Sequence, residues 1–97
     1  MTVKVIELNS KIDSDERTIY TMIYTIGETR YTTEIEIVLE QVGVKPLQVV
    51  RTEHAFWQNI QFNGPIAENL NELIRNVEAG EIIELPFVLG RLDDKYP

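Results

Sequence analysis

Alternating apolar positions dominate the first half of the chain and predict a β-hairpin. Residues 18–26 and 30–39 are rich in β-branched and aromatic side chains, which favour strands. Gly27 and Glu28 lie between these stretches. A Gly-X pair is typical of a two-residue type II′ loop, because glycine accepts a positive φ angle. We therefore predict two antiparallel strands joined by this loop.

The length of the loop decides which side chains share a face of the hairpin. A two-residue loop sets Tyr24 opposite Tyr31, whereas one extra residue would set Met22 opposite Glu34. The shorter loop is favoured because it keeps the apolar side chains together. The predicted buried face contains Tyr20, Met22, Tyr24, Ile26, Tyr31, Thr33, Ile35, Ile37 and Leu39.

The opposite face of the hairpin is mixed rather than plainly polar. Ile19, Ile23 and Val38 are aliphatic residues on a face that also contains threonines and glutamates. Three aliphatic side chains near one end of a sheet face suggest partial cover, by the C-terminal segment or by a second copy of the chain. These three residues are the candidate oligomer face.

The residues before the hairpin predict a first strand and a loop. Residues 2–8 contain apolar positions at strand spacing. Residues 9–16 are dense in turn-forming residues and are expected to form an exposed loop. The sequence thus predicts a three-stranded antiparallel meander over residues 2–39.

The second half contains one clear amphipathic helix, predicted at about residues 65–79. Pro65 suits the first helical position, and Gly80 suits the residue that ends a helix. A single apolar stripe at helical spacing contains Ile66, Leu70, Leu73, Ile74 and Val77. Packing of this stripe on the sheet explains its presence without a ligand.

The remaining segments predict shorter elements. Residues 47–51 favour a strand, and Thr52 is a candidate N-cap for a second, short helix near residues 53–60. Residues 82–85 predict a strand that ends at the following proline, and residues 87–89 are expected to continue extended before Gly90. Residues 91–97 predict a polar C-terminal tail.

The predicted fold class is α+β, with an antiparallel β-meander of about four to five strands and the main helix packed on one face. A chain of 97 residues corresponds to a single domain, residues 1–97.

Composition and charge narrow the classes of function. The net charge of −7 and the absence of a basic cluster argue against direct binding to nucleic acid or to an anionic membrane. The chain has no cysteine, which excludes disulfides and thiolate zinc sites. It contains no apolar run of the length that spans a bilayer and no signal-peptide core, so a cytoplasmic protein is expected.

No set of residues predicts catalysis, a metal site or a cofactor. His54 is the single histidine, and the neighbouring Glu53 would point in another direction on a helix or strand. Ser10 and Ser14, the two serines, lie in the predicted loop, which also lacks the spacing of a calcium site. The sequence therefore predicts neither an enzyme nor a cofactor-binding protein.

The segment 56–63 is the most informative for function, because it combines the single tryptophan with two phenylalanines and four side-chain amides. Aromatic residues and arginine with few carboxylates are typical of contact surfaces. The candidate site for a partner or a ligand consists of Arg51, His54, Trp57, Gln58, Asn59 and Phe62.

The favoured hypothesis is a small, non-catalytic binding module that acts through protein–protein contact and self-association. Small acidic domains of this kind suit the roles of adaptor, inhibitor or assembly subunit, including those of phages. One alternative is a small-molecule-binding protein with a pocket around Arg51, His54 and Trp57, in which arginine, amides and a stacking ring would hold the ligand. A further alternative is an acidic nucleic-acid mimic that uses Glu34, Glu36, Glu68 and Glu72.

Overall fold

The computed structural model describes residues 1–12 and 17–92, with the side chains of residues 39–42 and 45–49 left out of the description. In chain order the elements are β1 (Thr2–Ile12), β2 (Thr18–Ile26), β3 (Thr29–Val42), β4 (Lys45–Thr52), α1 (His54–Asn59), α2 (Gly64–Glu78) and β5 (Phe87–Arg91).

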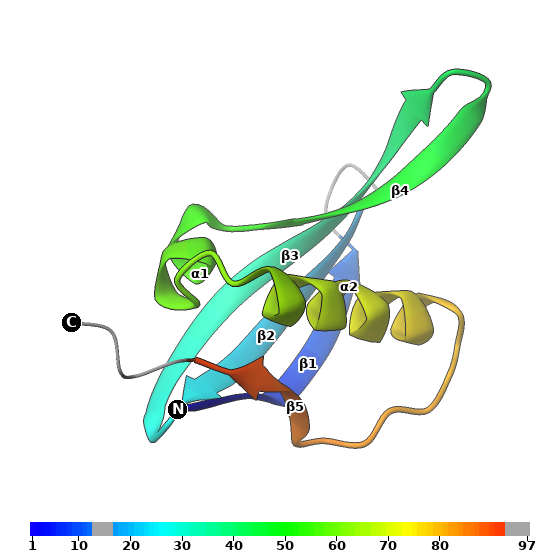
Figure 1. Ribbon diagram of the computed structural model, residues 1–97. Coiled ribbons are helices and arrows are strands. Elements are labelled where there is room, and N and C mark those ends of the chain that lie inside the picture. The colour runs from blue at the N-terminus through cyan, green and yellow to red at the C-terminus, as the bar shows by residue number, and fades with distance from the viewer. Residues whose placement is uncertain (13–16, 93–97) are drawn as a thin grey trace.

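The strands form one curved antiparallel sheet in the order β4-β3-β2-β1-β5, with the main helix α2 and the short helix α1 against it (Figure 1). The first four strands are a meander, and β5 returns to pair with β1 after the two helices. The predicted α+β class, with a four- to five-stranded meander, one main helix and a short second helix, is confirmed.

The pairing of β2 with β3 has the register that the two-residue loop predicts. Tyr24 lies opposite Tyr31, and Met22 lies opposite Thr33. Gly27 has a φ angle of 62°, the positive value that a type II′ loop needs at its first position. The N–H of Gly27 also donates to the carbonyl of Thr2 at 3.0 Å, which ties the loop to β1.

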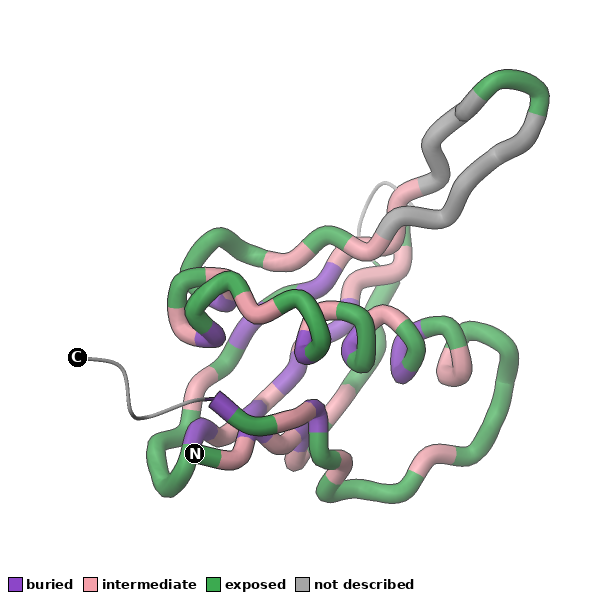
Figure 2. Tube along the Cα trace, in the orientation of Figure 1, coloured by how far each residue is buried: buried purple, intermediate pink, exposed green. Residues whose placement is uncertain are grey.

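This register sorts the residues of the sheet into two faces. We call the face toward the helices the inner face and the opposite one the outer face. The core lies between the inner face and the helices (Figure 2). Its buried members are Val3, Val5, Tyr20, Met22, Tyr24, Ile26, Ile35, Phe56, Ile60, Ile66, Leu70, Leu73, Ile74, Leu89 and Leu92.

Helix α2 begins and ends with local hydrogen bonds. The side chain of Asn63 accepts from the N–H of Ile66 at 3.1 Å and caps the first turn. At the other end, Gly80 has a φ angle of 82°, and the N–H groups of Gly80 and Glu81 donate to Val77 and Asn76. This is the Schellman arrangement, so Gly80 ends the helix as predicted.

Two predictions, one for the end of β1 and one for the start of α1, differ from the structure. Residues 9–12 were expected to begin an exposed loop, but they pair with residues 18–21 as the exposed end of β1; residues 13–16 lie outside the description. Thr52 was expected to cap α1, but it is the last residue of β4. The N-cap is Glu53, which makes no side-chain capping bond.

The predicted end of the chain is also corrected. Residues 82–85 were expected to form a strand, but they do not. The strand β5 follows Pro86 and includes residues 87–89, which were expected to be extended, because its partner is the distant β1. Arg91 belongs to β5, and Leu92 is buried and donates its N–H to the carbonyl of Met1 at 2.7 Å. These two residues are therefore part of the fold and not of a tail; residues 93–97 lie outside the description.

The β3–β4 hairpin extends well beyond the rest of the sheet (Figure 1). The pairing of β2 with β3 extends to Ile19 and Glu36, whereas β3 and β4 remain paired as far as Val42 and Lys45. Gly43 and Val44 form the two-residue loop at the tip, and Val44 is 92% exposed. We call residues 37–50 the ribbon.

Neither described helix is long and apolar enough to cross a membrane.

We predict that the stability of the fold decreases above about pH 10 because of Tyr24. Burial raises the pKa of Tyr24 above its ordinary value of 10.0, although a hydrogen bond from Asn59 opposes the shift. Above pH 10 the unfolded chain therefore loses this proton before the folded chain does, and unfolding is favoured; below pH 10 both states keep it. Urea unfolding at several pH values between 9 and 11.5 measures the slope.

The Tyr24→Phe variant is the control for this effect, because it removes the titrating group. It should show a flatter decline of the free energy of unfolding above pH 10. If the free energy of unfolding declined equally in the wild type and in Tyr24→Phe, the role of Tyr24 would be contradicted. A smaller decline that remains in the variant is expected from Tyr20, because burial also raises the pKa of this residue.

Candidate functional site

Helix α1 follows β4 directly and is held on the inner face by two buried side chains. Phe56 and Ile60 are 1% and 0% exposed, and they lie one turn apart on the same side of the helix. The ring of Phe56 packs edge-on against Tyr24, with 5.1 Å between centroids. This packing fixes which side of α1 faces solvent.

The solvent side of α1 and the turn that follows this helix present three of the six predicted site residues. His54, Gln58 and Phe62 are exposed, and Phe62 retains 64% of its accessible surface. The rings of His54 and Phe62 lie near each other, with centroids 6.2 Å apart. We call these three residues the α1 corner.

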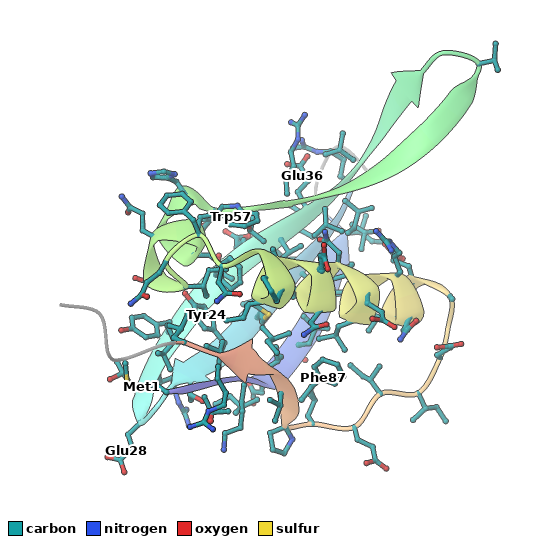
Figure 3. All side chains as sticks on the ribbon, viewed as in Figure 1. Met1, Tyr24, Glu28, Glu36, Trp57 and Phe87 are labelled. Carbon is teal, nitrogen blue, oxygen red and sulfur yellow. The ribbon has the colours of Figure 1, made fainter. Side chains whose placement is uncertain are left out.

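Two other predicted site residues are turned toward the domain. Trp57 is half-buried and packs against the core beside Phe56, at 6.2 Å between ring centroids (Figure 3). The side-chain amide of Asn59 donates to the hydroxyl of Tyr24 at 3.0 Å. Both residues therefore help to hold α1 in place and add little to the exposed surface.

The chain leaves α1 through a strained turn that carries Phe62. The N–H groups of Gln61 and Phe62 donate to Gln58 and Trp57, the same Schellman arrangement that ends α2. Here, however, the left-handed positions are occupied by Gln61 (φ 58°) and Phe62 (φ 54°) instead of by glycine. A non-glycine residue in this region costs about 1–2 kcal/mol.

The segment of the chain that carries the α1 corner is also free of formal charge. Residues 54–67 contain no aspartate, glutamate, lysine or arginine, although 26% of the residues of the whole chain are charged. An exposed, neutral, partly aromatic surface is unusual on a chain with a net charge of −7. The corner thus differs in chemistry from the acidic surface of α2.

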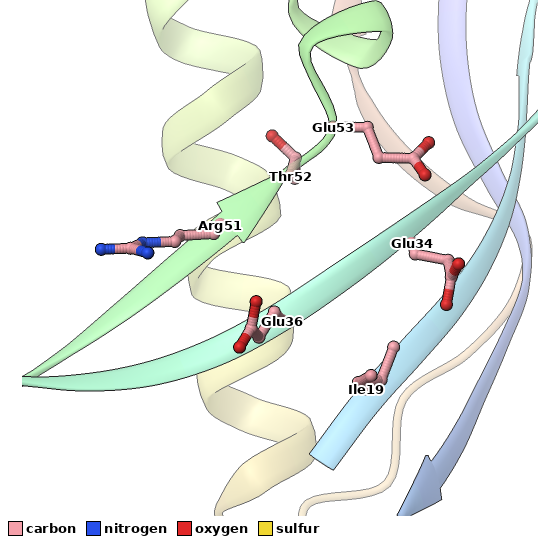
Figure 4. Close-up of a pocket in the computed structure, with 6 residues that line it drawn as sticks. All are labelled: Ile19, Glu34, Glu36, Arg51, Thr52 and Glu53. Atoms are coloured by element: carbon pink, nitrogen blue, oxygen red, sulfur yellow. The ribbon is translucent and has the colours of Figure 1, made fainter. Parts of the chain in front are cut away.

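The sixth predicted residue, Arg51, lies apart from the α1 corner. It lines an open hollow of about 370 Å³ at the end of β4 (Figure 4). Its described lining consists of Ile19, Glu34, Glu36, Arg51, Thr52 and Glu53. Neither His54 nor Trp57 is among these residues, so the described structure does not join Arg51, His54 and Trp57 in one pocket.

The carboxylates around this hollow form ion pairs or hydrogen bonds with neighbouring side chains. Arg17 and Glu36 form an ion pair at 2.6 Å, and Lys11 and Glu34 approach to 3.5 Å. The carboxylate of Glu53 accepts from the buried hydroxyl of Thr33 at 3.1 Å. The Oγ1 of Thr52 is buried and has no hydrogen-bond partner in the described part of the chain.

The predicted oligomer residues lie on the outer face of the sheet. Ile19, Ile23 and Val38 are half-buried, and their strand neighbours are Glu36, Thr32 and Val49. Both helices pack on the inner face, and no described element covers the outer one (Figure 1). The described C-terminal residues, which include β5 at the edge of the sheet, do not supply the expected cover.

The described residues offer little for catalysis or metal binding. No three His, Asp or Glu side chains within residues 1–12 and 17–92 come together as a metal site. His54 is exposed, and the adjacent carboxylate of Glu53 is bound to Thr33 rather than to the imidazole ring.

Sequence reasoning did not identify the strained turn, the orphan hydroxyl of Thr52 or the ribbon. For the ribbon a signal was present: Gly43 and Val44 lie between two runs of β-branched residues, as in the first hairpin. For Gln61 and Phe62 no signal exists, because these residue types do not predict a left-handed conformation.

Comparison with known proteins found no matching family model, no matching curated protein and no matching solved structure.

We predict opposite effects for two threonine-to-valine substitutions near the hollow. Thr52→Val should stabilise the fold by about 1 kcal/mol, because it replaces an unpaired buried hydroxyl with a methyl group of similar size. Thr33→Val should destabilise it by about 1 kcal/mol, because it removes the hydrogen bond to Glu53. Denaturant unfolding of both variants measures the change in the free energy of unfolding. If Thr52→Val destabilised the fold, the conclusion that the buried hydroxyl of Thr52 has no hydrogen-bond partner would be contradicted.

Proposed function

We propose that this protein is a small, non-catalytic binding module and that the α1 corner is the surface that meets a protein partner. The observation that carries the proposal is the exposure of Phe62 on a strained backbone. Strain of this kind is concentrated at functional sites, where the surrounding structure maintains it.

The energetics favour a partner that covers the ring of Phe62. Burying a phenylalanine side chain yields about 1.5–3 kcal/mol, and the free protein leaves most of this ring in water. The ring also enters the contact already positioned, because the Schellman bonds and His54 restrict the turn. A preorganised aromatic residue in this position is typical of an interface anchor.

The surroundings of Phe62 support a protein rather than a charged ligand. Because residues 54–67 carry no formal charge, the α1 corner provides no pairing group for a phosphate or a carboxylate apart from the imidazole of His54. The amide of Gln58 can form hydrogen bonds with a partner backbone at the rim. The predicted partner surface is apolar at its centre and neutral at its edge.

The nucleic-acid-mimic alternative receives less support from the arrangement of the glutamates. Glu34 and Glu36 are on the outer face of the sheet, where they pair with Lys11 and Arg17, while Glu72 is on α2, which packs on the inner face. A mimic needs its carboxylates along one surface.

We predict that two glycine substitutions in the strained turn separate stability from binding. Phe62→Gly and Gln61→Gly should each maintain or raise the free energy of unfolding, by up to about 1 kcal/mol, because glycine adopts the left-handed conformation without penalty. Phe62→Gly should abolish partner binding, and Gln61→Gly, the matched control, should retain it. Thermal unfolding provides the stability measurement.

Binding is measured by photo-crosslinking in extracts of the source cells. A benzophenone amino acid placed at Gln58, beside Phe62, should yield a discrete crosslinked adduct. An excess of unlabelled wild-type protein should compete for the partner and suppress this adduct, and an excess of the unlabelled Gln61→Gly variant should do the same. The Phe62→Gly variant should not suppress it. Equal competition by both variants, or an adduct of equal yield from the same probe at Ile82, which is 99% exposed, would contradict the proposal.

A further inference from the structure

Three basic residues that are far apart in the sequence lie together at one end of the sheet. Lys4 lies opposite Thr25, which lies opposite Arg30 on its other side. Arg91 lies opposite Thr2, two positions before Lys4 in β1. Neighbouring strands are about 4.8 Å apart, and residues two positions apart in a strand are separated by about 6.6 Å, so the three side chains share a small area. We call Lys4, Arg30 and Arg91 the basic patch.

The pleat of the sheet places the basic patch on the outer face. Val3 and Val5 are fully buried on the inner face, so Lys4, which lies between them in β1, points outward. Residues directly opposite each other in an antiparallel pair share a face, so Arg30 and Arg91 also lie on the outer face. Both arginines are exposed to solvent.

The basic patch has no carboxylate partner within the described part of the chain. The ion pairs described on the outer face join Lys11 to Glu34 and Arg17 to Glu36, at the other end of the sheet. A positive patch of this kind contrasts with the net charge of −7 of the whole chain. It is complementary to a negatively charged surface.

The helix side of the domain carries such a surface. Helix α2 packs its buried stripe on the inner face, so its other side points away from the sheet (Figure 1). Glu68 and Glu72 are exposed there, one turn apart, and together with Arg75 they line an open hollow of about 540 Å³. Residues 64–86 contain five glutamates and one basic residue. We call Glu68 and Glu72 the acidic patch.

The positions of the two patches determine how copies of the chain can meet. A symmetric contact between two basic patches, or between two acidic patches, would bring like charges together. Contact of the basic patch with the acidic patch brings opposite charges together. Because the patches lie on opposite sides of the sheet, a second copy cannot cover both at once, and each copy therefore needs two neighbours.

We propose that the basic patch of one copy binds the acidic patch of a second copy, so that the domains stack head to tail. Arg30 and Arg91 of one copy then meet Glu68 and Glu72 of the next. Helix α2 of the second copy also covers Ile23, which lies beside Thr25 on the uncovered outer face. Heterologous contacts of this kind form rings or open chains. The contact does not involve the α1 corner.

The net charge of the chain does not prevent this contact at physiological salt. At about 0.15 M ionic strength the Debye length is about 8 Å. The domain measures 44 × 27 × 24 Å, so most charges of two neighbouring copies are farther apart than this length, whereas the two patches are in contact. Exposed ion pairs are individually weak, so we expect association only at high protein concentration.

Sedimentation and NMR spectroscopy of the full chain test the contact. Between about 50 μM and about 1 mM protein, at about 0.15 M salt, the wild type should form species larger than a dimer. The amide signals of Arg30 and Arg91 should shift over this range together with those of Glu68 and Glu72. The amide signals of the α1 corner should not shift.

Two charge-reversed variants give the sharpest test. Arg30→Glu with Arg91→Glu makes both patches negative, and Glu68→Lys with Glu72→Lys makes both positive, so each variant alone should remain monomeric. An equal mixture of the two should associate again, because each variant carries the patches that complement those of the other. The second variant also reduces the net negative charge, so association governed by net charge alone would increase in it.

A neutral variant covers the case in which a charge-reversed variant does not fold. Arg30→Gln with Arg91→Gln removes two charges of the basic patch without reversing them. This variant should associate less than the wild type at each protein concentration, and association equal to that of the wild type would contradict the proposal.

Three further results would overturn the proposal. One is a wild type that remains monomeric at about 1 mM, including one in which a single-stranded oligonucleotide shifts Arg30 and Arg91, which would assign the basic patch to phosphate groups. Another is association that stops at a dimer and shifts only outer-face amides, such as those of Ile19 and Ile23. The third is a charge-reversed variant that associates alone. None of these variants alters the α1 corner, so failure here would leave the crosslinking result at Phe62 unaffected.

Discussion

The two-residue loop at Gly27 and Glu28 is the constraint on which the rest of the structure depends. It fixes the register of β2 with β3, and a strand that slips by one residue exchanges its two faces. In the observed register, Tyr24 lies on the inner face, where it meets Phe56 and receives the hydrogen bond from Asn59. The position of α1, and with it the exposure of His54 and Phe62, thus follows from a loop distant in sequence.

The assignment of residues to the inner and outer faces also determines which parts of the surface are covered. The inner face is covered by the helices, the outer face is not covered by any described element, and α1 ends in a turn whose left-handed residues hold an aromatic ring in water. A fold that had only to be stable would place glycine there, as it does at Gly80 after α2. The contrast between these two helix ends is the physical basis for the proposal that the α1 corner is a contact surface.

The sequence predicts the elements whose signals are local. The first hairpin and α2 have strong periodicity and glycine at the expected ends, and both are confirmed. The prediction is wrong where a distant partner decides: β5 begins only after Pro86 because β1 is its partner, and Thr52 remains in β4 because it pairs with Ile35. For the candidate site, sequence reasoning selected the segment 56–63, and its role in binding stays a prediction. Sequence reasoning could not separate Trp57 and Asn59, which face the core, from Phe62, which does not, because that depends on the packing of Phe56 and Tyr24.

The register of β2 with β3 is most directly measured by nuclear Overhauser effects between α-protons. In antiparallel sheets these protons approach closely in non-hydrogen-bonded pairs, which the loop places at Thr25 with Arg30 and at Ile23 with Thr32. We expect strong α-proton cross-peaks for these two pairs. Cross-peaks between Ile23 and Thr33 instead would mean that the loop is one residue longer and that the two faces of one strand are exchanged. The position of α1 would then differ, and the dependence of the fold on the two-residue loop would be contradicted.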